Sequence, residues 1–328
     1  MDNYIPPYDI TEEMLELTAQ IMEKVGKLDR VNNMERLPRL RKVSRIKSIH
    51  SSLAIENNTL TMQQVTQVLN GKRVLAPEED ICAVRNAFDA YKELDNIDPY
   101  SVEDLLKIHA IMMNGLVREQ GKLRSTQVGV YNENGEVMHI APPHDMVPEL
   151  IRQLFCWLKE SKGNMLIKSS VFHYEFEFIH PFCDGNGRMG RLWQTALLAS
   201  WKPIFAWIPI ESIIKDNQEA YYRAIRLSTS QGKSNAFVVF MLHMILDAVS
   251  GILQDTHEHQ NHISTQVSAL LGVLQSYPMT AQELMDKLGL KSRDGFRKHY
   301  LVPAIQAGLV EMTEPDKPTS RNQRYFKV

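Results

Sequence analysis

The chain has 328 residues, of which 44% are hydrophobic and 23% are charged, as in an ordinary water-soluble globular protein. This length predicts two domains, or one large domain and one small one. The net charge of -2 argues against a broadly polyanion-binding surface, and three scattered cysteines indicate neither a disulfide framework nor a zinc knuckle.

The beginning of the chain lacks the basic and apolar blocks of a signal peptide. No uninterrupted apolar run reaches the length that a membrane span needs. The nearest run, from Ala236 to Leu246, is too short and contains His243. We therefore expect a cytoplasmic protein with no membrane partner.

Residues 1–100 are predicted to form a helical N-terminal region. Apolar residues recur every three to four positions between Ile10 and Arg30, which predicts an amphipathic helix. A basic helix is expected to begin near Pro38 and end near His50. The next segment reads as helical up to Glu56, where two asparagines suit a helix C-cap. By itself, Glu56 is an unremarkable exposed carboxylate.

Residues 101–254 are predicted to form a second, mainly helical region that contains a β-hairpin. Residues 78–95 and 101–116 have helical spacing, and residues 127–131 and 137–140 are short β-type runs. The polar loop between these two runs contains Asn134-Gly135, a dipeptide typical of hairpin turns.

The most informative stretch runs from Phe176 to Arg191. Pro181 is expected to end a helix that begins near Ser169, because proline has no amide hydrogen. A tight turn follows, built from Asp184, Gly185, Asn186 and Gly187, before a helix that begins at about Arg188. The amides of Gly185, Asn186 and Gly187 therefore lie at a helix N-terminus, which attracts anions.

The side chains around this turn suit a nucleotide phosphate. Arg188 and Arg191 are three residues apart and can both reach an anion at the helix start. Asp184 offers an oxygen ligand for Mg²⁺, and His180 is a base that can take a proton from an attacking hydroxyl. Together they predict a phosphate site with a histidine that activates a nucleophile. They do not show which phosphate is attacked.

The stretch closely resembles the active-site motif of the Fic family, His-Pro-Phe-x-Asp/Glu-Gly-Asn-Gly-Arg-x-x-Arg. Every fixed position of the motif is met: His180, Pro181, Phe182, Asp184, Gly185, Asn186, Gly187, Arg188 and Arg191. The resemblance covers roughly residues 43–249 and implies a helical Fic bundle. It also implies transfer of AMP from Mg-ATP to a Ser, Thr or Tyr hydroxyl of a target protein.

The resemblance also gives Glu56 a role. Many Fic proteins carry an inhibitory helix with the pattern Ser/Thr-x-x-x-Glu-Gly/Asn, and the segment from Ser52 to Asn57 fits it. By this resemblance, Glu56 pairs with Arg191 and keeps that arginine from the γ-phosphate of ATP. A plain structural glutamate is the alternative.

Two further assignments follow from the same resemblance. The hairpin corresponds to the flap, whose residues Val128, Gly129 and Val130 hold the target segment by strand pairing. Tyr222, next to Tyr221, is expected to line the pocket for the nucleotide base. The alternatives are an ordinary surface hairpin and a tyrosine of the protein core.

Residues 265–328 have the order helix, helix, tight turn, helix and hairpin, which resembles a winged helix-turn-helix domain. Its third helix carries basic residues that suit phosphate contacts with DNA, among them Arg293, Arg297 and Lys298. Docking of another protein, or dimerisation, is the alternative.

Taken together, the sequence predicts a mainly α protein: a Fic helical bundle with a β-hairpin flap, followed by a winged helix-turn-helix domain. The predicted function is protein AMPylation with ATP and Mg²⁺, autoinhibited by Glu56. A Fic enzyme that uses another nucleotide donor or removes AMP is one alternative. A DNA-binding regulator with a nucleotide-sensing or self-modifying Fic domain is the other. The expected partner is a target protein that presents a hydroxyl, and a homodimer is left open.

Overall fold

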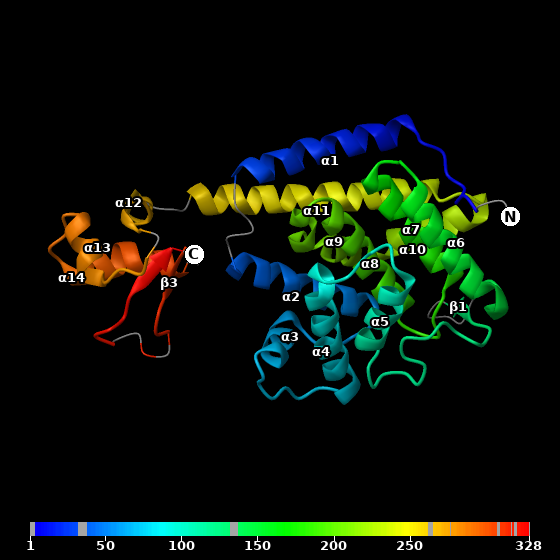
Figure 1. The fold of residues 1–328 in the computed structure, drawn as a ribbon, viewed down its shortest axis with the longest axis horizontal. Coiled ribbons are helices and arrows are strands. Elements are labelled where there is room, and N and C mark those ends of the chain that lie inside the picture. Colours follow the sequence, from blue (N-terminus) through cyan, green and yellow to red (C-terminus); the bar gives the residue numbers. More distant parts are fainter. Residues whose placement is uncertain are drawn as a thin grey trace. The chain divides into compact units, whose positions relative to one another are not determined.

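The computed structural model describes residues 4–31, 38–131, 137–261, 265–275, 277–306, 309–315, 317 and 320–327 (Figure 1). The chain divides into two compact units. The first contains Met1–Gly26 and Val43–Ser250, and the second contains Lys27–Lys42 and Gly251–Val328.

The protein is mainly helical, as the sequence predicted. Helices α1, α2 and α11 contain the boundaries between the two units. The helices of the first unit are α1 (Glu12–Val31), α2 (Pro38–Ile55), α3 (Met62–Leu69), α4 (Glu78–Lys92), α5 (Val102–Met112), α6 (Val147–Glu160), α7 (Met165–Ile179), α8 (Asn186–Trp201), α9 (Ile210–Asp216), α10 (Gln218–Gln231) and α11 (Asn235–Asn261). Short 3₁₀ turns lie at Glu93–Asp95, His144–Met146 and Pro203–Trp207.

Two predicted helix boundaries are wrong. The expected helix end near His50 does not exist, because α2 continues to Ile55 and the chain turns at Asn57, which has a φ of 63°. Residues 210–227, for which the sequence predicts one continuous helix, form two helices, α9 and α10. The break lies at Asn217, whose amide side chain donates a hydrogen bond to the carbonyl of Ile213 at 2.9 Å and so closes the end of α9.

Helices α7 and α8 lie at the centre of the first unit (Figure 1). In α7 every residue from Leu166 to Phe176 is buried, which is typical of a helix surrounded by others. In α8 the buried stretch runs from Arg188 to Leu198. The motif forms the connection between these two helices, so two largely buried helices position it.

One described helix, α11, is long and apolar enough over Asn235–Gln254 to cross a membrane by length and composition alone. The expectation that no stretch reaches this length is therefore corrected. Half of that window is buried inside the protein, including Phe237, Met241 and Ile245. We interpret its apolar character as that of a core helix.

A buried carboxylate holds α2 in place. Glu211, at the start of α9, is 1% exposed and accepts hydrogen bonds from Ser48 on α2 (2.7 Å), Tyr91 on α4 (2.7 Å) and Thr195 on α8 (3.2 Å). A buried carboxylate is tolerated when such donors satisfy its oxygens. The three hydroxyls therefore link α2, which carries Ser52 and is directly followed by Glu56, to α4, α8 and α9.

Tyr91→Phe is expected to lower the free energy of unfolding by about 1.5–3 kcal/mol, because a charged acceptor loses one of its three donors in a buried place. Urea unfolding of the variant measures this loss. The matched control is Tyr277→Phe, since Tyr277 is 53% exposed. Equal stability of Tyr91→Phe and the wild type would contradict the role assigned to Glu211.

The predicted hairpin consists of β1 (Gly129–Tyr131) and β2 (Val137–Ile140), which pair antiparallel with Gly129 opposite Ile140. The Asn134-Gly135 turn expected between them lies outside the described residues. Val128 directly precedes β1 and is not part of the strand.

The C-terminal part contains α12 (Thr265–Val273), α13 (Ala281–Lys287) and a helix made of α14 (Arg293–Phe296), a π-helical turn (Arg297–Leu301) and α15 (Val302–Gln306). Strands β3 (Val310–Met312) and β4 (Tyr325–Lys327) pair antiparallel. A separate apolar cluster, with Leu270, Leu284 and Phe296 at its centre, holds these elements together. The result is a small helical domain with a two-stranded sheet.

Candidate functional site

The motif begins with a strained residue. His180 ends α7 in the left-handed conformation (φ 51°, ψ 62°), and its amide donates to the carbonyl of Phe176 at 2.9 Å. A non-glycine residue rarely adopts this conformation unless its surroundings hold it there. The turn that follows ends at Gly185 (φ 83°), where a Cβ would also collide with Met113.

Asn186 closes the loop between the two helices. Its side-chain oxygen accepts from the amide of Phe182, and its side-chain nitrogen donates to the carbonyl of the same residue, both at 2.9 Å. Asn186 is 2% exposed. Asn186 was predicted to help bind an anion. Because both polar groups of its side chain are bonded to Phe182, only its backbone amide is available to a ligand.

The hydrogen bonding of His180 defines which ring nitrogen can act as a base. Nδ1 lies 3.3 Å from the carbonyl oxygen of Glu177. A carbonyl oxygen only accepts, so Nδ1 carries the hydrogen and Nε2 carries the lone pair in the neutral ring. This is the tautomer that a general base at Nε2 requires.

Asp184 and Arg188 contact each other at the start of α8. The guanidinium of Arg188 donates to Oδ1 of Asp184 at 3.0 Å, and the amide of Gly185 donates to the same oxygen. Arg188 is 8% exposed, yet its buried Nε has no hydrogen-bond partner in the described part of the chain. A buried guanidinium nitrogen without an acceptor is the kind of group that an entering phosphate oxygen would satisfy.

The surroundings of Asp184 suit Mg²⁺. Its side chain is about half exposed, and no group of three or more acidic, histidine or cysteine side chains forms a metal cage among the described residues. Magnesium is usually held by one or two carboxylates together with the phosphates of a substrate. One carboxylate beside an anion site therefore fits magnesium that arrives with a nucleotide.

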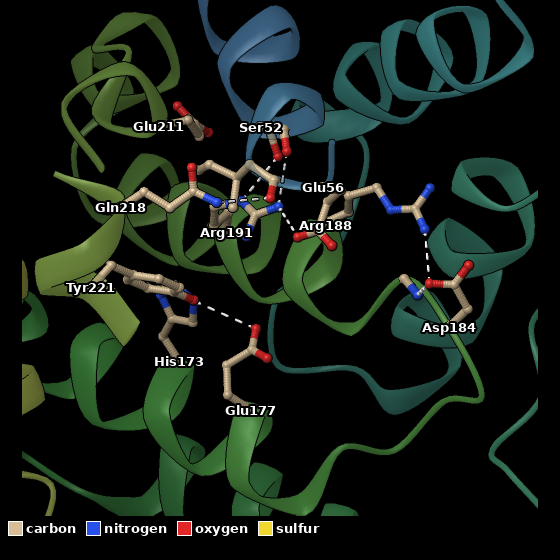
Figure 2. A network of polar contacts seen from close by, with 12 residues as sticks. Ser52, Glu56, His173, Glu177, Asp184, Arg188, Arg191, Glu211, Gln218 and Tyr221 are labelled. Atoms are coloured by element: carbon tan, nitrogen blue, oxygen red, sulfur yellow. Dashed lines mark hydrogen bonds and ion pairs between the residues drawn. The ribbon is translucent and has the colours of Figure 1, made fainter. Parts of the chain in front are cut away.

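Arg191 connects the motif to the segment that contains Ser52 and Glu56. Its guanidinium donates to the hydroxyl of Ser52 (3.1 Å), to the carbonyl of Ser52 (3.0 Å) and to Oε1 of Glu56 (2.7 Å) (Figure 2). Its side chain is 1% exposed. Burial lowers the pKa of Arg191, but the Glu56 carboxylate together with Tyr221 and Glu177 outweighs burial, and the net pKa is raised. The structure thus brings the predicted residues Ser52, Glu56 and Arg191 together.

The carboxylate of Glu56 also lies directly over the start of α8. A Cβ on Gly187 would overlap Oε1 of Glu56 and lie 2.9 Å from Nη1 of Arg191. Glycine at this position therefore makes room for an anion against the helix N-terminus, where the helix dipole favours negative charge. In this structure the anion is the side chain of Glu56.

The two adjacent tyrosines of α10 differ. Tyr221 is 2% exposed, and its hydroxyl lies 3.1 Å from Nε2 of the buried His173, so it belongs to the core. Tyr222 is 36% exposed. Burial raises its pKa, and the charge of Glu56 raises it further, so Tyr222 lies within electrostatic range of the Glu56 carboxylate. Only Tyr222 is accessible to a ligand.

His109, on α5, was not predicted as a site residue from the sequence. It contacts the loop between α7 and α8 at Phe182 and Asp184. Its ring stacks on Phe182 with 3.6 Å between ring centres. Nδ1 accepts from the amide of Gly121 at 2.9 Å, so Nε2 carries the hydrogen and donates to the carbonyl of Asp184 at 3.0 Å. Burial lowers the pKa of His109 to about 4. A single histidine in an apolar helix gave no signal of this role.

Glu177 is a second missed residue. Its side chain is 10% exposed and 3.7 Å from Nε2 of His173, and its Oε1 has no hydrogen-bond partner among the described residues (Figure 2). Burial raises the pKa of Glu177 to about 8, with Arg191 opposing and Glu56 reinforcing this shift. At neutral pH this carboxyl group is therefore mostly protonated.

Glu177→Gln is expected to make the protein more stable at alkaline pH. The folded pKa is raised, so the contribution of Glu177 is fully present below its unfolded pKa and is lost as the pH rises through about 8. Glutamine keeps the neutral form and removes this loss. In thermal unfolding between pH 5 and 9, the melting temperature of the variant should exceed that of the wild type at pH 9. The difference between the two melting temperatures should shrink toward pH 5. Parallel curves, as expected for the exposed control Glu219→Gln, would contradict this assignment.

Comparison with known proteins places the site in a known family. Residues 97–198 match the model of the Fic/DOC family, and residues 265–326 match the model of the Fic-like protein C-terminal domain. The chain is similar to the crystal structure of a Fic family protein from Desulfovibrio desulfuricans G20. The two share 45% identity and a TM-score of 0.76, over 99% of this chain and 98% of that one.

Curated relatives carry the name protein adenylyltransferase. The chain is 27% identical to protein adenylyltransferase fic-1 of Caenorhabditis elegans over 55% of this chain and 36% of that protein. It is 40% identical to the probable protein adenylyltransferase aq_aa38 of Aquifex aeolicus over 26% of this chain and 25% of that one. It thus spans well under half the length of these relatives. Its full-length match in sequence and fold to a Fic family protein, together with the complete motif, shows that the chain belongs to the Fic family.

Proposed function

We propose that this protein transfers AMP from ATP to a Ser, Thr or Tyr hydroxyl of a target protein, and that Glu56 inhibits the transfer. The observation that supports this most is the carboxylate of Glu56, which contacts Arg191 and lies over Gly187 where an anion would bind. Relatives named protein adenylyltransferases support the choice of reaction.

In the proposed reaction the target hydroxyl attacks the α-phosphorus of ATP. Its proton passes to Nε2 of His180, the bond between the α-phosphorus and the bridging oxygen breaks, and pyrophosphate leaves. Asp184 would hold Mg²⁺, which neutralises charge on the phosphates when it is bound. The amides at the start of α8, from Gly185 to Gly187, would hold the phosphates together with Arg188 and Arg191.

Inhibition follows from competition for one cation. While Glu56 accepts from Arg191, the γ-phosphate of ATP cannot use that arginine. The nucleotide then binds with its α-phosphate out of line with the attacking hydroxyl, and reactions of this kind depend strongly on alignment. The hydrogen bonds that Ser48 donates to Glu211 and that Arg191 donates to Ser52 support this reading, because they keep α2 against the site.

The hairpin would hold the target. We propose that an extended segment of the target pairs with the strand edge at Val128, Gly129 and Val130, as in other cases of strand addition. Tyr222 would contact the nucleotide base, since its ring is accessible and lies within electrostatic range of Glu56.

Intact-protein mass spectrometry tests the reaction. Glu56→Gly incubated with Mg-ATP and lysate proteins should yield products heavier by one adenylyl group. An increase of one phosphate, or of another nucleotide when a different donor is supplied, would replace the assigned donor chemistry. Loss of an adenylyl group from premodified proteins would favour the reverse reaction.

We propose DNA binding as a second function, carried by a winged helix-turn-helix arrangement in the C-terminal unit. The side chains of Arg293, Arg297 and Lys298 are exposed on the third helix of that unit. Burial raises the pKa of Tyr325 in β4, and the charges of Arg297 and Arg293 oppose that shift, so both arginines lie within electrostatic range of the hairpin. A basic helix beside a hairpin suits contacts with phosphates.

Gel-shift titration with genomic DNA fragments over a salt series tests this second function. Binding should weaken steeply as salt rises, and Arg293→Ala/Arg297→Ala should weaken it further at every salt concentration. No shift at low salt would exclude the DNA-binding role and favour docking of a protein on this unit.

A further inference from the structure

Arg124 is a buried arginine that the proposed reaction leaves without a role. It lies in the chain between α5 and β1, is 2% exposed and donates hydrogen bonds through all three guanidinium nitrogens. Nε donates to the carbonyl of His180 at 2.8 Å, and Nη2 donates to the carbonyl of Ile179 at 3.3 Å. The amide of Arg124 also donates to the carbonyl of Pro181 at 2.9 Å. One residue thus contacts three consecutive carbonyls around the proposed base.

The same guanidinium contacts both ends of the hairpin. Nη1 donates to the carbonyl of Thr126, three residues before β1, at 3.0 Å. Nη2 donates to the carbonyl of Pro142, two residues after β2, at 2.5 Å. A hydrogen bond from the side chain of Gln127 to the carbonyl of Ala141, at 2.7 Å, closes the base of the hairpin beside it.

This arrangement needs arginine. Burial lowers the pKa of Arg124, which reflects the cost of placing a cation away from water, and no carboxylate contacts it within the described residues. Among the described residues, the acceptors of its guanidinium hydrogen bonds are backbone carbonyls. Only a guanidinium has five donors in a fixed plane, so a lysine at this position would serve one or two of these acceptors and leave the others unpaired.

The contacts also explain how His180 keeps its conformation. The left-handed φ of 51° at this residue is costly, and the carbonyl that Arg124 Nε holds belongs to His180 itself. Without this hydrogen bond the carbonyl of His180 loses the donor described here, and the amide of Arg124 holds only the carbonyl of the next residue, Pro181. A ring shifted by about 1 Å is enough to lower a rate about a hundredfold.

We propose that Arg124 is a positioning residue that couples the target-docking hairpin to the base His180. It joins the two ends of the hairpin and the end of α7 into one unit. A target strand seated on the hairpin is thereby held in a fixed relation to Nε2 of His180. The inference rests on the proposed AMP transfer, but its structural part can be tested without that activity.

The test uses the full chain with Glu56→Gly, to which Arg124→Lys, Arg124→Ala or the control Arg118→Lys is added. Arg118 is exposed in the same connection and has no assigned role. Three quantities are measured: transfer of label from α-³²P-ATP, affinity for ATP, and the ring resonances of His180 by NMR with ¹³C-labelled histidine. Arg124→Ala is also assayed with added guanidinium ion.

Arg124→Lys should lower label transfer at least tenfold and move or broaden the His180 resonances, while ATP affinity stays within about threefold. Guanidinium should restore part of the transfer in Arg124→Ala. Arg118→Lys should match its parent in all three. Unchanged label transfer in Arg124→Lys would overturn the proposal. A loss of ATP affinity as large as the loss of label transfer would overturn it as well. If the Glu56→Gly parent transfers no label, the proposed function fails by itself. The His180 resonances then decide the positioning role, and unshifted resonances in Arg124→Lys would reject it.

Discussion

Replacing His180 with alanine in the Glu56→Gly protein is expected to lower AMP transfer about 10²- to 10⁴-fold, the usual contribution of a general base. Nδ1 of His180 faces the carbonyl of Glu177, which leaves the lone pair on Nε2 for the proton of the target hydroxyl. Alanine removes that acceptor. The phosphate-binding groups come from α8 and are unchanged, so affinity for ATP should stay the same.

The measurement is the initial rate of label transfer from α-³²P-ATP at saturating ATP, with ATP affinity measured alongside. His243→Ala is the matched control, since this histidine is about half exposed on α11 and its Nε2 lies 3.5 Å from the exposed Glu13. Its rate should equal that of the parent. A His180→Ala rate within a factor of three of the parent would show that another group takes the proton.

Glu56→Gly is expected to raise AMP transfer about ten- to a hundredfold over the wild type. The hydrogen bond of 2.7 Å between Arg191 and Glu56 joins two charged groups, and such bonds contribute about 1.5–3 kcal/mol. Removing the carboxylate frees the place over Gly187 and makes Arg191 available to the γ-phosphate. About 1.4 kcal/mol corresponds to a tenfold change in equilibrium, which sets the expected range.

Stability gives an independent measure of the same contact. Without Glu56 the buried Arg191 keeps only its bonds to Ser52, so the variant should melt at a lower temperature than the wild type. Mg-ATP should restore the melting temperature by supplying a new anion. Glu56→Gln keeps the side-chain volume but not the charge. Its melting temperature should lie between those of Glu56→Gly and the wild type. A Glu56→Gly protein as inactive as the wild type would refute the inhibitory role.

The sequence allowed much of this fold and site to be predicted. Helical spacing and caps identified most helices, and the pattern from His180 to Arg191 identified the turn between α7 and α8. Hydrophobic spacing does not indicate where a helix ends because a polar side chain has formed a hydrogen bond with a backbone carbonyl of the preceding turn. The break at Asn217 was therefore missed.

The residues that support the site could not be predicted for a different reason. His109 and Arg124 act through hydrogen bonds to backbone carbonyls far away in the chain, and Glu177 is affected by its burial near Arg191 and Glu56. Each looks like an ordinary surface or core residue in a single sequence, because a contact of this kind leaves no local pattern. By contrast, Glu56 could be linked to Arg191 because a short pattern accompanies that contact in the family.

The central claim is that His180 drives AMP transfer from a site that Glu56 holds closed. Label transfer from α-³²P-ATP with Mg²⁺, measured side by side for the wild type, Glu56→Gly and Glu56→Gly/His180→Ala, tests it most directly. We predict weak labelling in the wild type, strong labelling in Glu56→Gly and none above background in the double variant. Strong labelling in the double variant, or equal labelling in the wild type and Glu56→Gly, would contradict it.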